Sequence, residues 1–85
     1  MKEGWFWQDT SDSSLEDKVT LAAQKYREKY GRAPAVCYVN SGQHAEALGD
    51  DGFDVGGVAV RGMRNIARNY FWLGMEKIKK GGDKK

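Results

Sequence analysis

The sequence predicts a small α+β domain of the order β-α-β-β-β, a mixed four-stranded sheet with one helix packed on one face. An amphipathic pattern at residues 14–30 indicates the helix, apolar runs before and after it indicate strands, and glycine-rich turn signals separate the later strands. A chain of 85 residues with 40% hydrophobic content suits one domain. We place this domain at residues 1–78, followed by a basic tail at residues 79–85 that we expect to be flexible.

The helix has the clearest boundaries of all the predicted elements. Ser13 and Glu16 match a capping box, in which both side chains bind backbone amides that lack an intrahelical partner. Gly31 can adopt the left-handed conformation that ends helices, and Pro34 prevents the helix from resuming. Lys18 belongs to the polar side of this helix. Its apolar stripe, at spacings of three and four, consists of Leu15, Val19, Ala22, Ala23, Tyr26 and Tyr30.

Four segments have the composition of strands. Gly4 to Gln8 and Ala35 to Val39 flank the helix, which is long enough to be the crossover of a parallel β-α-β unit. Val55 to Arg61 is predicted as the third strand, and Tyr70 to Met75 as the fourth, after a turn or loop. The alternative for residues 63–78 is a helix, because several apolar side chains there also fit helical spacing.

Residues 40–57 contain few signals for regular structure. Six of the eleven glycines fall between Gly42 and Gly62, and Asp50 to Gly52 is a turn signal. We expect one helical turn at His44 to Leu48 and little regular structure around it. A long loop of this kind is often either functional or mobile.

Six of the ten aromatic residues form two triplets, Trp5-Phe6-Trp7 and Tyr70-Phe71-Trp72. Alternation along a strand sends neighbouring side chains to opposite faces, so each triplet places rings on both sides of the sheet. One helix covers one face, and the opposite face then keeps large apolar groups of the kind that mark an interface. We therefore expect a non-enzymatic protein-binding or regulatory module that docks a protein or self-associates as a homodimer through this face.

Charge is distributed unevenly along the chain, and it supports a second hypothesis. Residues 1–60 carry a net charge of −4, whereas residues 61–85 carry +6. Cations interleaved with aromatic rings are typical of single-stranded nucleic-acid binders, although no motif of a known class is visible. Nucleic acid is thus the alternative partner. The candidate binding residues under the two hypotheses are Trp5, Trp7, Arg61, Arg64, Arg68, Tyr70 and Trp72.

No pattern in the sequence indicates catalysis, a metal or a cofactor. Cys37 lies in an apolar strand, where a free cysteine usually behaves as a small hydrophobe, and a single partner at His44 cannot complete a zinc site. The acidic residues at 50–54 do not match a calcium loop, and the glycines precede a strand instead of the helix that a phosphate loop needs. We expect no enzyme activity, no metal and no cofactor.

The predicted environment is the cytoplasm. The apolar runs are at most five residues long, far short of a bilayer span, so we expect no membrane partner. A single cysteine excludes an internal disulfide and suits a reducing compartment.

Overall fold

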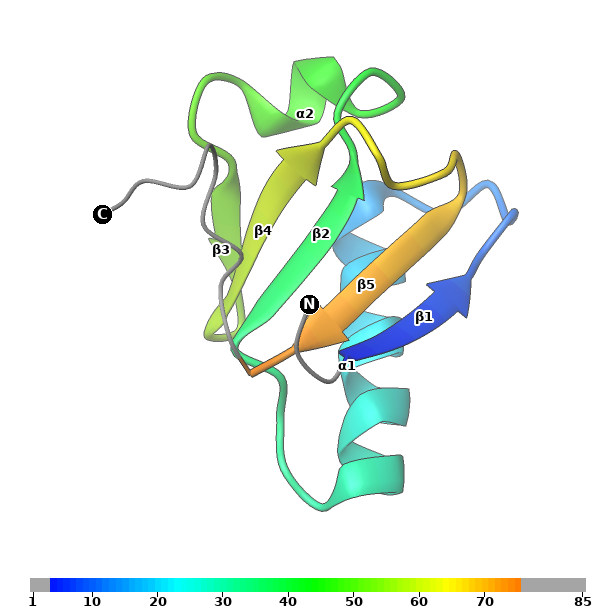
Figure 1. Ribbon diagram of the computed structural model, residues 1–85, viewed down its shortest axis with the longest axis vertical. Coiled ribbons are helices and arrows are strands. Elements are labelled where there is room, and N and C mark those ends of the chain that lie inside the picture. Colours follow the sequence, from blue (N-terminus) through cyan, green and yellow to red (C-terminus); the bar gives the residue numbers. More distant parts are fainter. Residues whose placement is uncertain (1–3, 76–85) are drawn as a thin grey trace.

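The computed structural model describes residues 4–75 and shows a mixed five-stranded sheet with a long helix on one face (Figure 1). The strand order is β1-β5-β2-β4-β3, in which β2 and β4 are parallel and the other neighbours are antiparallel. The small α+β class is confirmed, but the numbers of strands and helices were predicted wrongly. The elements are β1 (Gly4–Gln8), α1 (Leu15–Tyr30), β2 (Val36–Asn40), α2 (Ala45–Leu48), β3 (Phe53–Val55), β4 (Val58–Met63) and β5 (Tyr70–Gly74).

The predicted third strand is in fact a hairpin. Gly56 and Gly57 have φ angles of 53° and 87°, so they form a two-residue turn that reverses the chain between β3 and β4. Two successive residues with positive φ match the right-handed twist of the flanking strands, and glycine adopts this conformation without steric cost. The predicted strand from Val55 to Arg61 is therefore interrupted directly after its first residue.

The glycine-rich segment is more structured than predicted. The helical turn is confirmed as α2, and the Gly52 amide donates to the Leu48 carbonyl at 2.8 Å just after it. The chain then enters β3, which pairs with β4. Local hydrogen bonds and this strand pairing thus order a region whose composition suggested a loop.

The last predicted strand is confirmed as β5, with a turn before it, and the helical alternative is wrong for the described part of residues 63–78. β5 pairs antiparallel with β1 on one side and with β2 on the other. β5 therefore lies between β1 and β2, the two strands that flank α1 in the sequence. β1 and β2 run parallel to each other but are not adjacent. The central position of β5 fits its burial, since Phe71, Trp72 and Leu73 are all buried. The predicted tail at residues 79–85 and the domain boundary at residue 78 lie outside the described residues.

Local chemistry defines both ends of α1. Ser14, and not Ser13 as predicted, is the N-cap: its Oγ accepts from the Asp17 amide at 3.2 Å. Gly31 ends the helix with a φ of 83°, as predicted, and its amide donates to the Arg27 carbonyl at 2.8 Å. Lys18 is buried although it was assigned to the polar side. A long lysine stem can cover apolar surface while its charged end reaches toward water.

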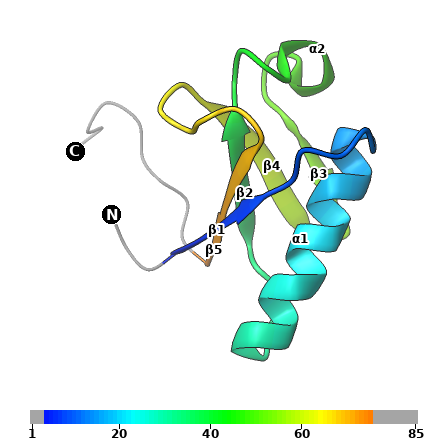
Figure 2. The same cartoon turned by 90° about the vertical axis from the view of Figure 1, so that its right-hand side faces the viewer.

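The helix covers only one face of the sheet, as Figure 2 shows for the described elements. Val19, Ala22 and Tyr26 of α1 pack there against side chains from β2, β4 and β5. A second apolar cluster lies on the opposite face and consists of Val36, Tyr38, Ala59, Ile66 and Trp72, with Met63 packed against it. Neither helix in the described part of the chain is long and apolar enough to cross a membrane.

Candidate protein interface

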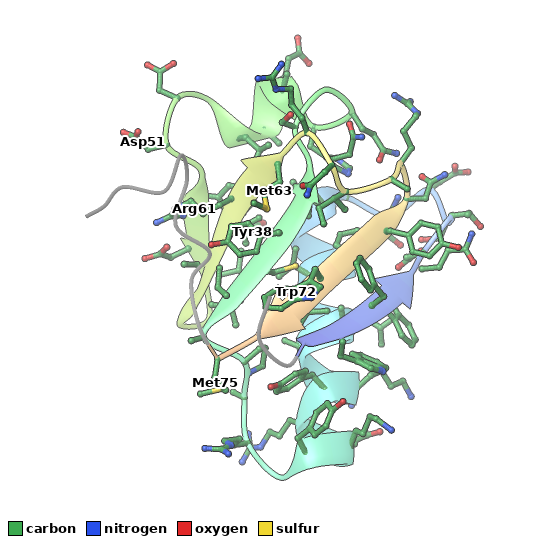
Figure 3. The ribbon with its side chains drawn as sticks, in the orientation of Figure 1. Tyr38, Asp51, Arg61, Met63, Trp72 and Met75 are labelled. Atoms are coloured by element: carbon green, nitrogen blue, oxygen red, sulfur yellow. The ribbon has the colours of Figure 1, made fainter. Side chains whose placement is uncertain are left out.

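A row of large side chains crosses the sheet on the face opposite α1. The strand registers place Phe6 of β1 beside Trp72 of β5, Trp72 beside Tyr38 of β2, and Tyr38 beside Arg61 of β4. The rings of Tyr38 and Trp72 have centroids 5.8 Å apart. Figure 3 labels three of these four side chains, Tyr38, Arg61 and Trp72, and shows them crossing the middle of the sheet. We call these four residues the aromatic row.

The middle of the aromatic row is closed to solvent. Trp72 is 2% exposed and Tyr38 is 5% exposed. Arg61 is held in place, because its Nη1 donates to the carbonyls of Val60 and Phe53 at 2.8 and 3.1 Å and lies 3.6 Å from Asp54 Oδ1. The predicted apolar face is therefore present, but most of its area is not available for stacking against a ligand.

A glycine lets the Trp72 ring lie against β1. A Cβ atom added to Gly4 would overlap the indole of Trp72 from the neighbouring strand. The indole thus occupies the space that any other residue at position 4 would need. This contact joins β1 to β5 through a side chain in addition to their backbone pairing.

The loop between β4 and β5 is held above this face by an amide network. Asn40 Nδ2 donates to the Ile66 carbonyl at 2.8 Å, which places Ile66 in the second apolar cluster. Two hydrogen bonds of 2.7 Å join Gln43 and Asn69. Gln43 Nε2 donates to Asn69 Oδ1, and the backbone N–H of Asn69 donates to Gln43 Oε1. Asn69 also has a φ of 70°, a conformation that asparagine tolerates. The two charged side chains of this loop, Arg64 and Arg68, are exposed.

Exposure on this face is concentrated at its β1 end. Phe6 is 52% exposed and Tyr70 is 36% exposed. Their ring centroids are 6.4 Å apart in an edge-to-face arrangement. These two rings, which we call the exposed pair, are the aromatic surface that the face offers to a partner.

β1 is an edge strand, and the backbone groups of three of its five residues point away from the sheet. Among residues 4–75 it pairs with β5, on one side only. The Asp9 amide donates to the Asn69 carbonyl at 2.9 Å and so points toward β5. Because backbone groups alternate along a strand, those of Trp5 and Trp7 also point toward β5, while those of Gly4, Phe6 and Gln8 point outward. We call the outward N–H and C=O groups of these last three residues the β1 edge.

The predicted binding residues are divided between two faces of the molecule. Trp5 and Trp7 are half-buried on the α1 side, with their ring centroids 5.4 Å apart, and Trp5 lies 6.4 Å from the ring of Tyr26. Arg61 and Trp72 belong to the aromatic row, Tyr70 to the exposed pair, and Arg64 and Arg68 to the loop beside it. The prediction omitted Phe6, the most exposed large apolar side chain among the described residues.

A shallow pocket of about 580 Å³ lies near the carboxyl ends of the parallel strands β2 and β4. Such strand ends often form ligand sites in α/β proteins. Here the pocket's arginine, Arg61, already bonds to backbone carbonyls, and the acidic side chains at its rim are exposed. The residues around it include Tyr38, Ser41, Leu48, Asp51, Arg61 and Met63.

Neither of the two candidate nucleophilic or basic groups is activated. Burial raises the pKa of the Cys37 thiol to about 12, so the thiolate is disfavoured. Burial, together with the charges of Lys18 and Arg68, lowers the pKa of His44. Among residues 4–75, no three histidine, cysteine, aspartate or glutamate side chains converge on a position that could hold a metal ion.

Comparison of the chain with protein-family models, with curated proteins and with solved structures finds no significant match.

Proposed function

We propose that this chain is a non-enzymatic protein-binding module that receives an extended segment of a partner at the β1 edge. The observation that carries the proposal is an uncharged edge strand beside the exposed pair Phe6 and Tyr70. Addition of a strand to a sheet edge derives affinity from main-chain hydrogen bonds and specificity from alternate side chains. The single cysteine, Cys37, suits a reducing compartment, and we place the module in the cytoplasm.

The β1 edge offers both main-chain hydrogen bonds and side-chain contacts to an added strand. Gly4, Phe6 and Gln8 each present one N–H donor and one C=O acceptor to an added strand. Phe6 projects beside that edge, and complete burial of such a side chain contributes about 1.5 to 3 kcal/mol of transfer free energy. Tyr70 then supplies a second ring against which the partner's side chains can pack.

Paired variants of exposed apolar residues test this proposal. The wild type, Phe6→Lys and Leu21→Lys are immobilised and used to capture proteins from an extract of the source cells. Leu21 is a matched control, because it is a large apolar side chain that is 39% exposed and belongs to α1 and not to a strand. We expect a specific partner to be retained by the wild type and by Leu21→Lys and lost with Phe6→Lys. Equal retention by all three proteins, or no specific retention together with a monomeric protein, would contradict the proposal.

Single-stranded nucleic acid is the second candidate partner. It is favoured by Arg64 and Arg68, which are exposed on the loop that leads directly into Tyr70. Titration with labelled oligonucleotides at two salt concentrations tests it, because phosphate contacts weaken as salt rises. Binding that is lost in Arg64→Ala/Arg68→Ala but not weakened in Phe6→Lys would support nucleic acid over a protein partner, since the added lysine attracts phosphate. Absence of binding at low salt would exclude this candidate.

A further inference from the structure

We propose that the partner at the β1 edge is a second copy of this chain. In this arrangement, which rests on the proposed function, β1 of one subunit pairs antiparallel with β1 of the other about a two-fold axis at Phe6. The two sheets then become one continuous sheet across the dimer. Figure 2 shows the side of the molecule on which β1 lies, with no described element between β1 and the viewer.

Strand geometry selects the position of this axis. The outward residues Gly4, Phe6 and Gln8 are symmetric about Phe6, the central residue of β1. An axis at Phe6 therefore pairs Phe6 with Phe6 of the second copy and Gly4 with Gln8, and all five residues of each strand take part. Axes at Trp5 or Trp7 leave part of each strand unpaired, so they satisfy fewer backbone groups.

The charge of the strand also suits a two-fold partner. A two-fold axis places each side chain at its centre opposite its own copy, so a charge there would be repelled by an identical charge. None of the five residues of β1 is charged. On the α1 face, Trp5 would lie opposite Trp7 of the second copy, and on the other face the two Phe6 rings would lie side by side.

The opposite edge of the sheet lacks this self-complementarity. β3 has three residues, and its central residue is Asp54. A two-fold axis at the centre of β3 would place the two Asp54 carboxylates opposite each other. The structure therefore offers one edge for self-association and makes the other unsuitable.

Mass measurement in solution is the first test. Analytical ultracentrifugation over a concentration series should show a dimer for the wild type and for Leu21→Lys. Phe6→Lys should raise the dimer dissociation constant at least tenfold, because the two lysines meet at the axis. A wild type that remains monomeric at the highest concentration, or a dimer that Phe6→Lys leaves unchanged, would overturn the inference.

A designed crosslink tests the register. A directly opposed, hydrogen-bonded antiparallel pair has Cα atoms about 5.5 Å apart, and a short bis-maleimide reagent links two cysteines at that separation. Phe6→Cys should form a covalent dimer with this reagent, whereas Leu21→Cys should not. The native Cys37 is buried and does not compete. Equal crosslinking of both variants, or of neither, would overturn the proposed register.

A proline variant separates loss of pairing from loss of folding. Gln8→Pro removes an outward N–H group without removing a hydrogen bond between β1 and β5. It should weaken the dimer while the circular dichroism spectrum and melting temperature stay close to those of the wild type, and an undiminished dimer would count against pairing at this edge. A monomeric wild type that still captures another protein through Phe6 would overturn the inference alone, whereas a monomer that captures none would overturn the proposed function as well.

Discussion

The two edges of the sheet differ in length, charge and exposure. β1 has five uncharged residues and an exposed phenylalanine at its centre, whereas β3 has three residues with an exposed carboxylate at its centre. Short length and charge are the usual devices that prevent an edge strand from pairing with another chain. β3 has both protections and β1 has neither. For this reason we propose β1, and not β3, as the edge that receives a partner.

The two edges are also attached to the sheet in different ways. β3 is the hairpin partner of β4, so its position depends on the two-residue turn at Gly56 and Gly57. β1 pairs with a strand more than sixty residues later in the chain, and its position depends on long-range contacts such as that of Gly4 with Trp72. Mutations should therefore affect the two edges separately.

Gly4→Val should have the largest effect on stability. The added side chain overlaps the Trp72 indole, and overpacking of this kind costs about 1 to 3 kcal/mol. We expect a lower free energy of unfolding in urea and a changed tryptophan emission, with loss of amide protection in β1 but not in β3. Unchanged emission and stability would show that the indole can move aside without cost.

Gly57→Ala should lower the free energy of unfolding by a smaller amount, and its effect should be confined to β3, the other edge of the sheet. No atom would contact the added Cβ, but the φ of 87° is strained for alanine, which costs about 1 kcal/mol. Hydrogen exchange should show faster opening of β3, while the dimer dissociation constant stays within twofold of wild type. A change in the dimer dissociation constant of more than twofold would refute the independence of the edges.

Asp54→Val should change stability by less than about 0.5 kcal/mol, because its contact with Arg61 is largely exposed. It removes the charge from β3, however, and leaves an apolar edge strand. We expect concentration-dependent oligomers larger than a dimer, detected by light scattering, since both edges can then pair. Asp54→Asn is the control, because it removes the charge without adding an apolar side chain.

Acidification should have the smallest effect on the free energy of unfolding, and this effect should arise at Asp9, directly after β1. Hydrogen bonds from Ser11 lower the pKa of Asp9 below its ordinary value of 3.8, and Lys18 lowers it further. The ionised carboxylate therefore stabilises the folded state above that value, and this contribution is lost as the pH falls through the folded-state pKa. NMR titration of the Asp9 side chain should show the lowered pKa, and Asp9→Asn should remove this part of the pH dependence. A pKa at or above 3.8 would contradict the expectation.

Local signals in the sequence predicted the individual elements well. The apolar stripe and Gly31 gave α1 correctly to its last residue, and the composition of Tyr70 to Met75 correctly favoured a strand over a helix. The turn at Gly56 and Gly57 was also encoded locally, as two glycines between valines, but it was interpreted as part of one strand. That error was avoidable, because paired glycines between apolar residues are a hairpin signal.

The order of strands and the location of the exposed rings could not be predicted in the same way. Alternation showed that Phe6 and Trp5 point to opposite faces, but the pattern does not say which face a helix covers. The insertion of β5 between β1 and β2 arises from contacts between distant residues, which no local pattern contains. Without that order, β1 could not be identified as an edge, and Phe6 was passed over in favour of its tryptophan neighbours.

The central place of β5 has a consequence for how the chain folds during synthesis. β1 and β2 emerge from the ribosome early, but they are not neighbours in the sheet, and β1 has no strand to pair with until residues 70–74 arrive to lie between the two. Pairings between residues distant in sequence form slowly, because the intervening chain must first be closed into a loop. For that interval the Trp5-Phe6-Trp7 strand has two unpaired edges instead of one. The nascent chain is therefore most vulnerable to misassociation in its first strand until its last described strand is complete.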